Sequence, residues 1–253
     1  MRIATWNVNS LKVRLPHVLN WLAANPVDVL CLQETKQQDE DFPKTELLAA
    51  GYQSIFSGQK TYNGVAILSR ASASEVQHGI PGYDDEQKRV IAATFGDIRV
   101  VCIYVPNGQA VDSDKYYYKL KWLTALRDWL TQELKRHPKL VLLGDYNIAP
   151  EDRDVHDPVV WQGNVLVSEA ERIHFQNLIK LGLHDSFRLF EQPGKSFTWW
   201  DYRMMAFRRN HGLRIDHILI SLPLVAQCKS CVIDKSPRKL ERPSDHAPVV
   251  VEL

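Results

Sequence analysis

The stretch RVIAATFGDIRVVCIYV, residues 89–105, contains two runs of β-forming residues separated only by Gly96 and Asp97. The next apolar run, KLVLLG at 139–144, follows a segment, 114–136, whose apolar side chains recur at helical spacing. Two adjacent strands followed by a strand that is reached through a helix predict a mixed β-sheet. This combination favours an α/β fold.

Similar patterns recur over the rest of the chain. Helical spacing appears at 14–24, which ends before Asn25 and Pro26, and at 169–181, which ends at Gly182. Alternating or short continuous apolar runs predict further strands near 2–8, 28–33, 52–57, 64–69, 215–221 and 247–253.

So many strands would overload one open sheet. The economical arrangement is a four-layer α/β sandwich, in which two mixed β-sheets pack face to face and helices cover the outer faces. No Gly/Ser-rich or Pro-rich linker, low-complexity segment or short repeat divides the sequence. We therefore predict a single domain over residues 1–253.

The composition is that of an ordinary globular protein, with 45% hydrophobic and 24% charged residues. No apolar run approaches the roughly 18 residues needed to span a bilayer. The start, MRIATWNVNS, has a strand pattern and lacks the apolar segment of a signal peptide. We expect a soluble, cytoplasmic monomer with no membrane partner.

The formal net charge is only +1, which gives no support for a dedicated nucleic-acid binder. The distribution of charge matters more than its sum, however. Positive clusters occur at 86–90, 203–211 and 235–242, and each of them could be no more than a solvated surface.

The four cysteines do not predict a disulfide framework or a metal site. Cys31 and Cys102 lie inside apolar strand-like runs, where a free cysteine behaves as a small hydrophobic residue. Cys228 and Cys231 form a single C-x-x-C pair, which is weak evidence for zinc without a second pair. On one strand they would point to different faces, so we expect a structural role for both.

Polar residues stand where several of the predicted strands begin or end. One such residue is common turn chemistry, and a lone histidine before a strand is most often structural. The repetition is what predicts a site, because functional groups collect in the loops at one rim of an α/β scaffold. The residues concerned are Asn7, Asn9, Glu34, Tyr104, Asp145, Asn147, Asp216, Asp245 and His246.

This set of side chains suits the hydrolysis of phosphate esters. Carboxylates and amides favour hard cations such as Mg²⁺ or Mn²⁺ over zinc. Tyrosine and asparagine can donate hydrogen bonds to phosphate oxygens, and a histidine held by an aspartate is a fixed acid, base or positive charge. A covalent serine or cysteine mechanism is not favoured, because the sequence has no G-x-S-x-G motif and no cysteine in this set.

Eight blocks resemble, in order, the exonuclease III family, the bacterial branch of abasic-site endonucleases within the endonuclease–exonuclease–phosphatase superfamily. The resemblance covers residues 2–253 and implies a two-sheet sandwich, in agreement with the strand pattern. It also implies Mg²⁺-dependent cleavage, with Mn²⁺ as a substitute, of double-stranded DNA at abasic sites or damaged 3′ ends. The blocks are WNVNSL (6–11), LQETK (32–36), YNGVAILS (62–69), YVPNG (104–108), GDYNIAP (144–150), FTWWDY (197–202), GLRIDHIL (212–219) and PSDHAPV (243–249).

The resemblance also implies a role for each strand-end residue. Glu34 is similar to the principal metal ligand, with Asn9 near the same ion and Asp245 as a second carboxylate of the metal site. Asp145 resembles the residue that activates the attacking water, assisted by Asn147, and both are expected to lie near the metal. In the remaining roles, Asn7 positions the nucleophile or phosphate, Tyr104 contacts the phosphate and Asp216 orients His246.

Other residues are expected to contact DNA. Arg89 resembles a phosphate clamp, Asn107 lies beside the DNA backbone, and Trp199 belongs to the block that precedes a DNA-facing loop. That loop, 203–211, carries three arginines together with Met204, Met205 and Phe207.

Two interpretations of the loop 203–211 remain open. In the first, Met204, Met205 and Phe207 form a wedge that enters the groove beside a lesion, while Arg208 and Arg209 hold phosphates. In the second, the three apolar side chains tuck into the sandwich and the arginines are solvated.

The segment 159–172 is less typical of the family. In relatives this loop lies near the pocket for the extruded sugar, and here it offers Val165, Leu166 and Val167. The balance between incision at abasic sites and trimming of 3′ ends is therefore open. Two rival functions are a phosphodiesterase or phosphatase that acts on lipid or inositol phosphates, and a non-catalytic nucleic-acid binder on the same fold.

Overall fold

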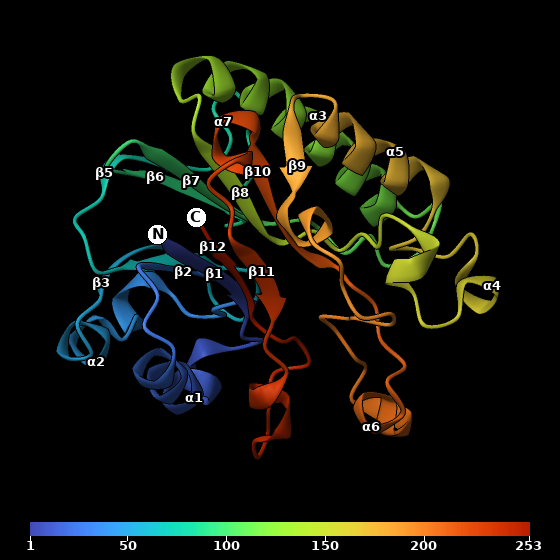
Figure 1. Cartoon of the computed structure of the whole chain (residues 1–253), viewed down its shortest axis with the longest axis horizontal. Coiled ribbons are helices and arrows are strands. Elements are labelled where there is room, and N and C mark those ends of the chain that lie inside the picture. Colours follow the sequence, from blue (N-terminus) through green and yellow to red (C-terminus); the bar gives the residue numbers. More distant parts are fainter.

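The computed structural model describes residues 1–253 and contains two six-stranded β-sheets that pack face to face (Figure 1). The first sheet is mixed, because β1 runs parallel to β2 and antiparallel to β12. Its spatial order is β11 (Ser230–Ile233), β12 (Val249–Glu252), β1 (Arg2–Asn7), β2 (Val29–Gln33), β4 (Val65–Ser69) and β3 (Gln53–Ser57).

The second sheet is also mixed, with β7 parallel to β8 and antiparallel to β6. Gly144 lies where β7 and β8 approach closely, since an added Cβ would stand 1.9 Å from the carbonyl oxygen of Ile103. The spatial order is β5 (Ser74–His78), β6 (Val90–Phe95), β7 (Ile98–Tyr104), β8 (Leu140–Asp145), β10 (Asp216–Ser221) and β9 (Leu183–Asp185).

Helices cover the outer face of each sheet. Helices α1 (Leu11–Ala24) and α2 (Lys44–Ala49) lie on the first sheet, and α3 (Asp114–Arg136) and α5 (Glu169–Ile179) lie on the second (Figure 1). The predicted four-layer sandwich is therefore confirmed. Shorter helices occur in the connections: α4 (Pro158–Trp161), α6 (Ala206–Arg209) and α7 (Leu222–Val225).

The alternation of side chains along β7 separates two of the apolar layers. Val100 and Cys102 point into the core between the sheets, whereas Val101 and Ile103 pack in the layer that contains α3 and α5. A third layer joins the first sheet to α1 and α2. Each strand of this kind is buried on both faces, which explains its nearly continuous apolar sequence.

All the strands and helices predicted from the sequence are present. Most of their ends lie one to three residues from the predicted positions, and the others coincide with them. Helix α1 begins at Leu11 rather than at residue 14, and Pro16 lies inside it. Helix α3 has the predicted bounds, and the Ser113 hydroxyl accepts a hydrogen bond from the Tyr116 backbone N–H at its start. Helix α2 and strands β5, β9 and β11 were not predicted.

The C-x-x-C pair does not lie on a single strand. Cys228 lies before β11 instead of on it, and both Cys228 and Cys231 contact the core between the sheets as free thiols. None of the helices is long and apolar enough to cross a membrane.

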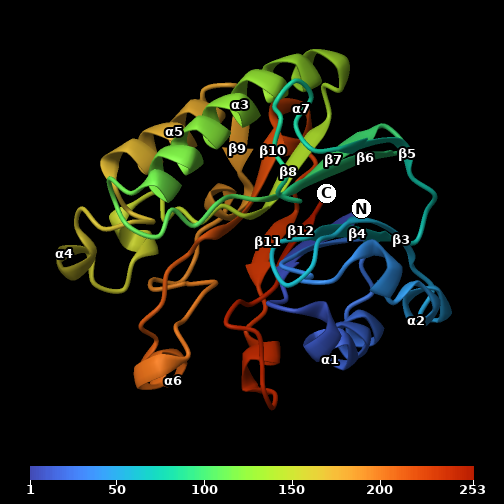
Figure 2. The ribbon, with the colours of Figure 1, turned by 180° about the vertical axis from the view of Figure 1, so that it is seen from behind.

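Two connections extend beyond the sandwich at the same end. One carries α6, and the other carries a 3₁₀ turn at Ser236–Lys239; both extend below the sheets in the views from the front and from behind (Figures 1 and 2).

Candidate active site

The polar strand ends meet at one edge of the sandwich because of the strand register. Tyr104 at the end of β7 is paired with Asp145 at the end of β8, and Asp216 at the start of β10 is paired with the same Asp145. Across the core, β1 and β2 run parallel, so that Asn7 and Gln33 end side by side. The parallel pairs β7–β8 and β1–β2 and the antiparallel pair β8–β10 thus bring these polar strand ends to one edge of the sandwich.

Asn7 connects the two sheets at this edge. Its side-chain amide donates to Glu34 Oε1 at 2.8 Å and to Asp145 Oδ2 at 2.9 Å. Glu34 follows the first sheet's β2, whereas Asp145 ends the second sheet's β8. One buried amide therefore fixes the two carboxylates relative to each other.

His246 approaches the same carboxylate from the loop before β12. Its Nδ1 lies 2.9 Å from Asp216 Oδ2, and its Nε2 lies 3.8 Å from Asp145 Oδ2. Because a carboxylate only accepts, Nδ1 carries the proton in this contact. The ring is therefore oriented by Asp216 with Nε2 directed toward Asp145.

Three site residues have left-handed backbone conformations that residues other than glycine seldom adopt. The φ angles are 45° at Asn9, 51° at Glu34 and 49° at Asn147. Asparagine tolerates this region, but glutamate is unusual there. The Glu34 carbonyl accepts from the Ser10 backbone N–H at 2.8 Å, and the Asn147 N–H donates to Asp145 Oδ1 at 2.9 Å. The backbone strain thus concentrates at the site, as it often does at functional residues.

A second set of contacts surrounds Asp245. Its Oδ1 accepts from the Asn9 side chain at 2.9 Å, and its Oδ2 accepts from the Trp199 indole N–H at 3.0 Å. The Lys36 ammonium lies between Glu34 Oε2, at 2.9 Å, and Asn9 Oδ1, at 2.6 Å. Lys36 was not predicted, although it belongs to the LQETK block.

The donor set fits a hard divalent cation. Glu34 and Asp145 each place a carboxylate oxygen within 4.8 Å of the other. His246 Nε2 lies within the same distance, but the neighbouring carboxylates keep the ring protonated, so it contributes a positive charge and no metal ligand. This group does not include Asp245, whose carboxylate is occupied by Asn9 and Trp199. The Lys36 ammonium already stands as a cation between oxygens of Glu34 and Asn9. Carboxylate and amide oxygens of this kind suit Mg²⁺ or Mn²⁺.

Burial and neighbouring charges shift the protonation of the central groups. Burial raises the pKa of Asp145 to about 7, and the Asp216 carboxylate adds to this while His246 opposes it. For His246, burial disfavours the charged form, but Asp216, Asp145 and Asp245 outweigh it and raise the pKa to about 10. Burial and the Glu34 carboxylate hold the pKa of Tyr104 well above its usual value. At neutral pH the imidazolium and the phenol therefore keep their protons.

A cavity of about 680 Å³ beside the site is lined by the residues that are expected to contact phosphate: Arg89, Tyr104 and Asn107. The Arg89 guanidinium lies 4.6 Å from the centre of the Tyr104 ring and donates to the Tyr104 carbonyl oxygen. The exposed Asn107 donates from its side chain to Asn147 Oδ1 at 3.1 Å. Arg89 and Asn107 thus both contact residues at the edge of the sandwich where the polar strand ends meet, which is called the catalytic edge below.

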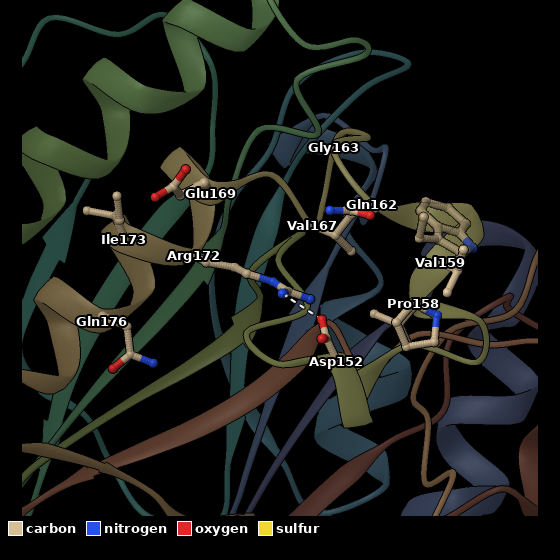
Figure 3. Close-up of a pocket in the computed structure, with 12 residues that line it drawn as sticks. Asp152, Pro158, Val159, Gln162, Gly163, Val167, Glu169, Arg172, Ile173 and Gln176 are labelled. Atoms are coloured by element: carbon tan, nitrogen blue, oxygen red, sulfur yellow. Dashed lines mark hydrogen bonds and ion pairs between the residues drawn. The ribbon is translucent and has the colours of Figure 1, made fainter.

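A second cavity, of about 590 Å³, lies between α4 and α5 (Figure 3). Arg172 forms an ion pair with Asp152 there at 2.8 Å. The segment 159–172 supplies much of its lining, including Val167, whereas none of the strand-end residues lines it. The strand-end residues therefore lie away from it.

The loop 203–211 divides its apolar residues between solvent and protein. Met204 and Met205 are 77% and 64% exposed, and both have left-handed φ angles. Phe207 instead packs edge-on against Trp200, with ring centres 5.0 Å apart, and lies under the Arg238 guanidinium. Phe207 is thus half-buried against the protein while Met204 and Met205 are exposed, and the wedge stays a prediction.

Comparison with known proteins identifies the family. The model of the Endonuclease/Exonuclease/phosphatase family matches residues 4–246. The chain belongs to this family. A curated member of the family, exodeoxyribonuclease III of Haemophilus influenzae, is 36% identical to it over 267 residues, which cover 100% of both proteins.

Solved structures of family members agree with the fold. The 3′ phosphatase NExo from Neisseria, bound to product DNA hairpin, is 52% identical with a TM-score of 0.98, over 100% of this chain and 99% of that one. An AP endonuclease from Archaeoglobus fulgidus is 39% identical with a TM-score of 0.95, over 99% and 98%. The predictions of the exonuclease III family, the two-sheet fold and a hydrolytic DNA repair nuclease are confirmed by these matches.

Proposed function

We propose that this DNA repair nuclease uses Mg²⁺ to hydrolyse phosphate esters at the 3′ ends of duplex DNA. The observation that carries the hydrolytic role is the contact set around Asp145, in which Asn7 links it to Glu34 and His246 lies 3.8 Å away. We further propose that the protein acts in the cytoplasm, and that it acts as a monomer, since one chain supplies every residue of this set.

Asp145 is the proposed base for the attacking water, and Asn147 assists it. Donors on Asn7 and on the Asn147 backbone hold the carboxylate in one orientation and leave lone pairs free for a water. A pKa of about 7 is close to the value that suits a general base at neutral pH. A cation held at Glu34 would lower this pKa and keep Asp145 ionised.

Groups that are already in place would stabilise the negative charge that develops on the phosphate in the transition state. His246 remains protonated because Asp216 holds Nδ1, and its positive charge lies next to the proposed position of the phosphate. The Tyr104 hydroxyl supplies a hydrogen-bond donor, and Asn7 positions Glu34 and Asp145, which take both of its side-chain N–H groups. Donors fixed in advance in a buried site stabilise a transition state more than donors that must reorganise.

Glu34 and Asn9 are the proposed holders of Mg²⁺, with Asp145, Asn147 and Asp245 on its periphery. When bound, the ion would polarise the phosphate and offset its negative charge. Mn²⁺ should substitute, because it accepts the same oxygen ligands.

The proposed preference for 3′ ends rests on the segment 165–167 and on similarity to the Neisseria 3′ phosphatase. Leu166 and Val167 are buried in an apolar cluster with Leu213 and Ile215, and Trp199 packs against it. We infer that Leu166 occupies room that an extruded abasic sugar would need, which disfavours incision within a strand.

DNA contacts are proposed on both sides of the catalytic edge. On one side, Arg89 and Asn107 line the cavity of about 680 Å³ and are positioned to hold backbone phosphates. On the other, the exposed Met204 and Met205 are the proposed wedge, beside the exposed arginines Arg208 and Arg209. Positive side chains give sequence-independent affinity for phosphates.

The test uses three duplexes: one with a 3′-phosphate, one with a recessed 3′-hydroxyl, and one with an internal abasic analogue. With Mg²⁺ we expect kcat/KM at the 3′ ends to exceed that for abasic incision by at least about tenfold, roughly the 1.4 kcal/mol that a blocked apolar pocket can supply. Asp145→Asn is the matched inactive control. Equal or faster abasic incision would refute the proposed preference for 3′ ends. Full activity in the presence of a chelator would refute the proposed requirement for a metal ion.

A further inference from the structure

An ion pair with two fully buried side chains lies behind the catalytic edge, between α3 and α5. Lys119 projects from the second turn of α3, and its ammonium forms an ion pair with Glu171 in the first turn of α5. Both side chains have no exposed surface. Helices α3 and α5 run side by side over the second sheet, so that the pair is enclosed between them (Figure 1).

The Lys119 ammonium also holds two loops of the proposed site. It donates to the Asn147 carbonyl oxygen at 2.7 Å and to the Asn107 carbonyl oxygen at 3.2 Å. With the Glu171 contact, all three N–H groups of the ammonium have an acceptor. Asn147 has a left-handed φ of 49°, and its N–H in turn fixes Asp145.

Glu171 fixes a third loop with its remaining lone pairs. Its Oε1 accepts from the Leu166 backbone N–H at 3.0 Å. Its Oε2 accepts from the Ser168 backbone N–H at 3.1 Å and from the Ser168 hydroxyl at 2.6 Å, which makes a capping box at the start of α5. Leu166 has a φ of 77°, which an L-residue adopts only when its surroundings enforce it.

The pair is therefore more than a brace between two helices. Each of the three loops that it holds carries a residue assigned above to the reaction or to its specificity: Asn107, Asn147 and Leu166. A brace alone would not require the ammonium to bind carbonyl groups of site residues. Two apolar side chains of similar volume would join the helices without burying charge.

We propose that Lys119, neutralised by Glu171, is a positioning residue that holds the Asn147 backbone so that Asp145 is aligned for the reaction. This inference rests on the proposed role of Asp145 as the base. Lys119 itself contacts neither substrate nor metal and acts only through the Asn147 and Asn107 carbonyl groups.

The central variant is Lys119→Met combined with Glu171→Gln, assayed on whichever of the three duplexes the parent protein cleaves fastest. Methionine fills the space of the lysine stem, and glutamine keeps an acceptor for the capping box, so no buried charge is left unpaired. We expect kcat to be at least tenfold lower and KM to stay within twofold. The melting temperature should fall because the Asn147 and Asn107 carbonyl groups lose their donor, but no charge is left buried alone. Lys119→Met alone should lose far more stability, because Glu171 is then buried without a partner.

Two further variants separate positioning from stability. Glu171→Gln alone keeps the ammonium on both carbonyl groups, so kcat should stay within about threefold even if the protein melts earlier. Tyr116→Phe removes the 2.7 Å contact between the Tyr116 and Ser168 hydroxyls, at the far end of the same network. It should leave kcat unchanged.

The outcome does not depend on which DNA end is preferred, because each variant is compared with the parent on the parent's best substrate. A double variant with parental kcat would overturn the inference, as would a Glu171→Gln variant that loses as much kcat as the double variant. If the double variant does not fold, Lys119→Met is assayed below its melting temperature, and an unchanged kcat there has the same meaning. An inactive parent would instead count against the proposed function.

Discussion

Asp216→Asn tests whether the orientation and charge of His246 are set by one carboxylate. Asp216 is buried, and its two oxygens lie 2.9 Å and 3.2 Å from His246 Nδ1. The substitution keeps the shape of the side chain and removes its charge. An asparagine can also present its NH₂ group to Nδ1, which would favour the wrong tautomer of the ring.

The size of the effect follows from the electrostatics of His246. A rise of its pKa from 6.5 to about 10 corresponds to about 5 kcal/mol in favour of the imidazolium, net of the cost of burial. Asp216 is the largest favourable contribution, so its loss leaves burial opposed only by the more distant carboxylates. We expect the imidazolium to be lost near neutral pH and kcat to fall by about 10²–10³-fold, the usual range for the loss of one preorganised group that stabilises transition-state charge.

The assay compares Asp216→Asn, His246→Gln and the double variant on a 3′-phosphate duplex at saturating DNA. Because the two residues act as a unit, the double variant should be about as slow as the slower single variant. Losses that multiply would refute the coupling.

The pH dependence gives a second test of the same pair. His246 of the parent stays charged below a pKa of about 10, whereas in Asp216→Asn that pKa is lower. The ratio of parental to variant kcat should therefore shrink as the pH is lowered from about 9 to 6. A ratio that is constant with pH would mean that Asp216 does not act through the charge of His246.

Other predictions concern the metal, the wedge and a buried histidine. Glu34→Gln should lower cleavage by about two or more orders of magnitude, as expected for loss of a metal ligand's charge, with little change in DNA affinity in a gel-shift assay. Met204→Ser with Met205→Ser should weaken binding to damaged ends without changing the melting temperature, whereas Phe207→Ser should lower the melting temperature. His217 is buried beside Arg214, and burial lowers its pKa to about 4. Since the unfolded state binds that proton near 6.5, about 3 kcal/mol of stability present above pH 6.5 is lost on acidification to pH 4, and His217→Gln should flatten this slope in denaturant titrations.

The fold was largely predictable because most strands are buried on both faces. Continuous apolar sequence in β7 and β8 leaves few alternatives to a covered sheet. Strand β5 was missed because its sequence, SEVQH, is polar and mostly exposed, so that its pairing with β6 is its only strand signal. Strand β11 is a short edge strand, and such strands carry little periodicity.

The site was predictable to the extent that strand ends reveal it. The order of polar residues along the chain does not show that Asn7 lies between Glu34 and Asp145, because that contact depends on how the two sheets pack. Lys119 gave no signal either, since a lysine in a helix is normally solvated. The composition of the loop 203–211 does not show that Phe207 packs on Trp200 while Met204 and Met205 are exposed.

The dependence of the site on both sheets has a consequence for its rigidity. Asn7 is not the only polar group that crosses between them, since the Gln33 amide also donates to Cys102 Sγ at 3.3 Å. Buried polar groups of this kind are costly unless they are satisfied, and they are satisfied only at one relative position of the sheets. Sliding of one sheet over the other would therefore break the Asn7–Asp145 and Gln33–Cys102 contacts at the same time, while Asn7 would keep Glu34 and Gln33 would keep Thr5. The apolar core sets the distance between the sheets, whereas these two amides select the offset at which Glu34 and Asp145 face each other.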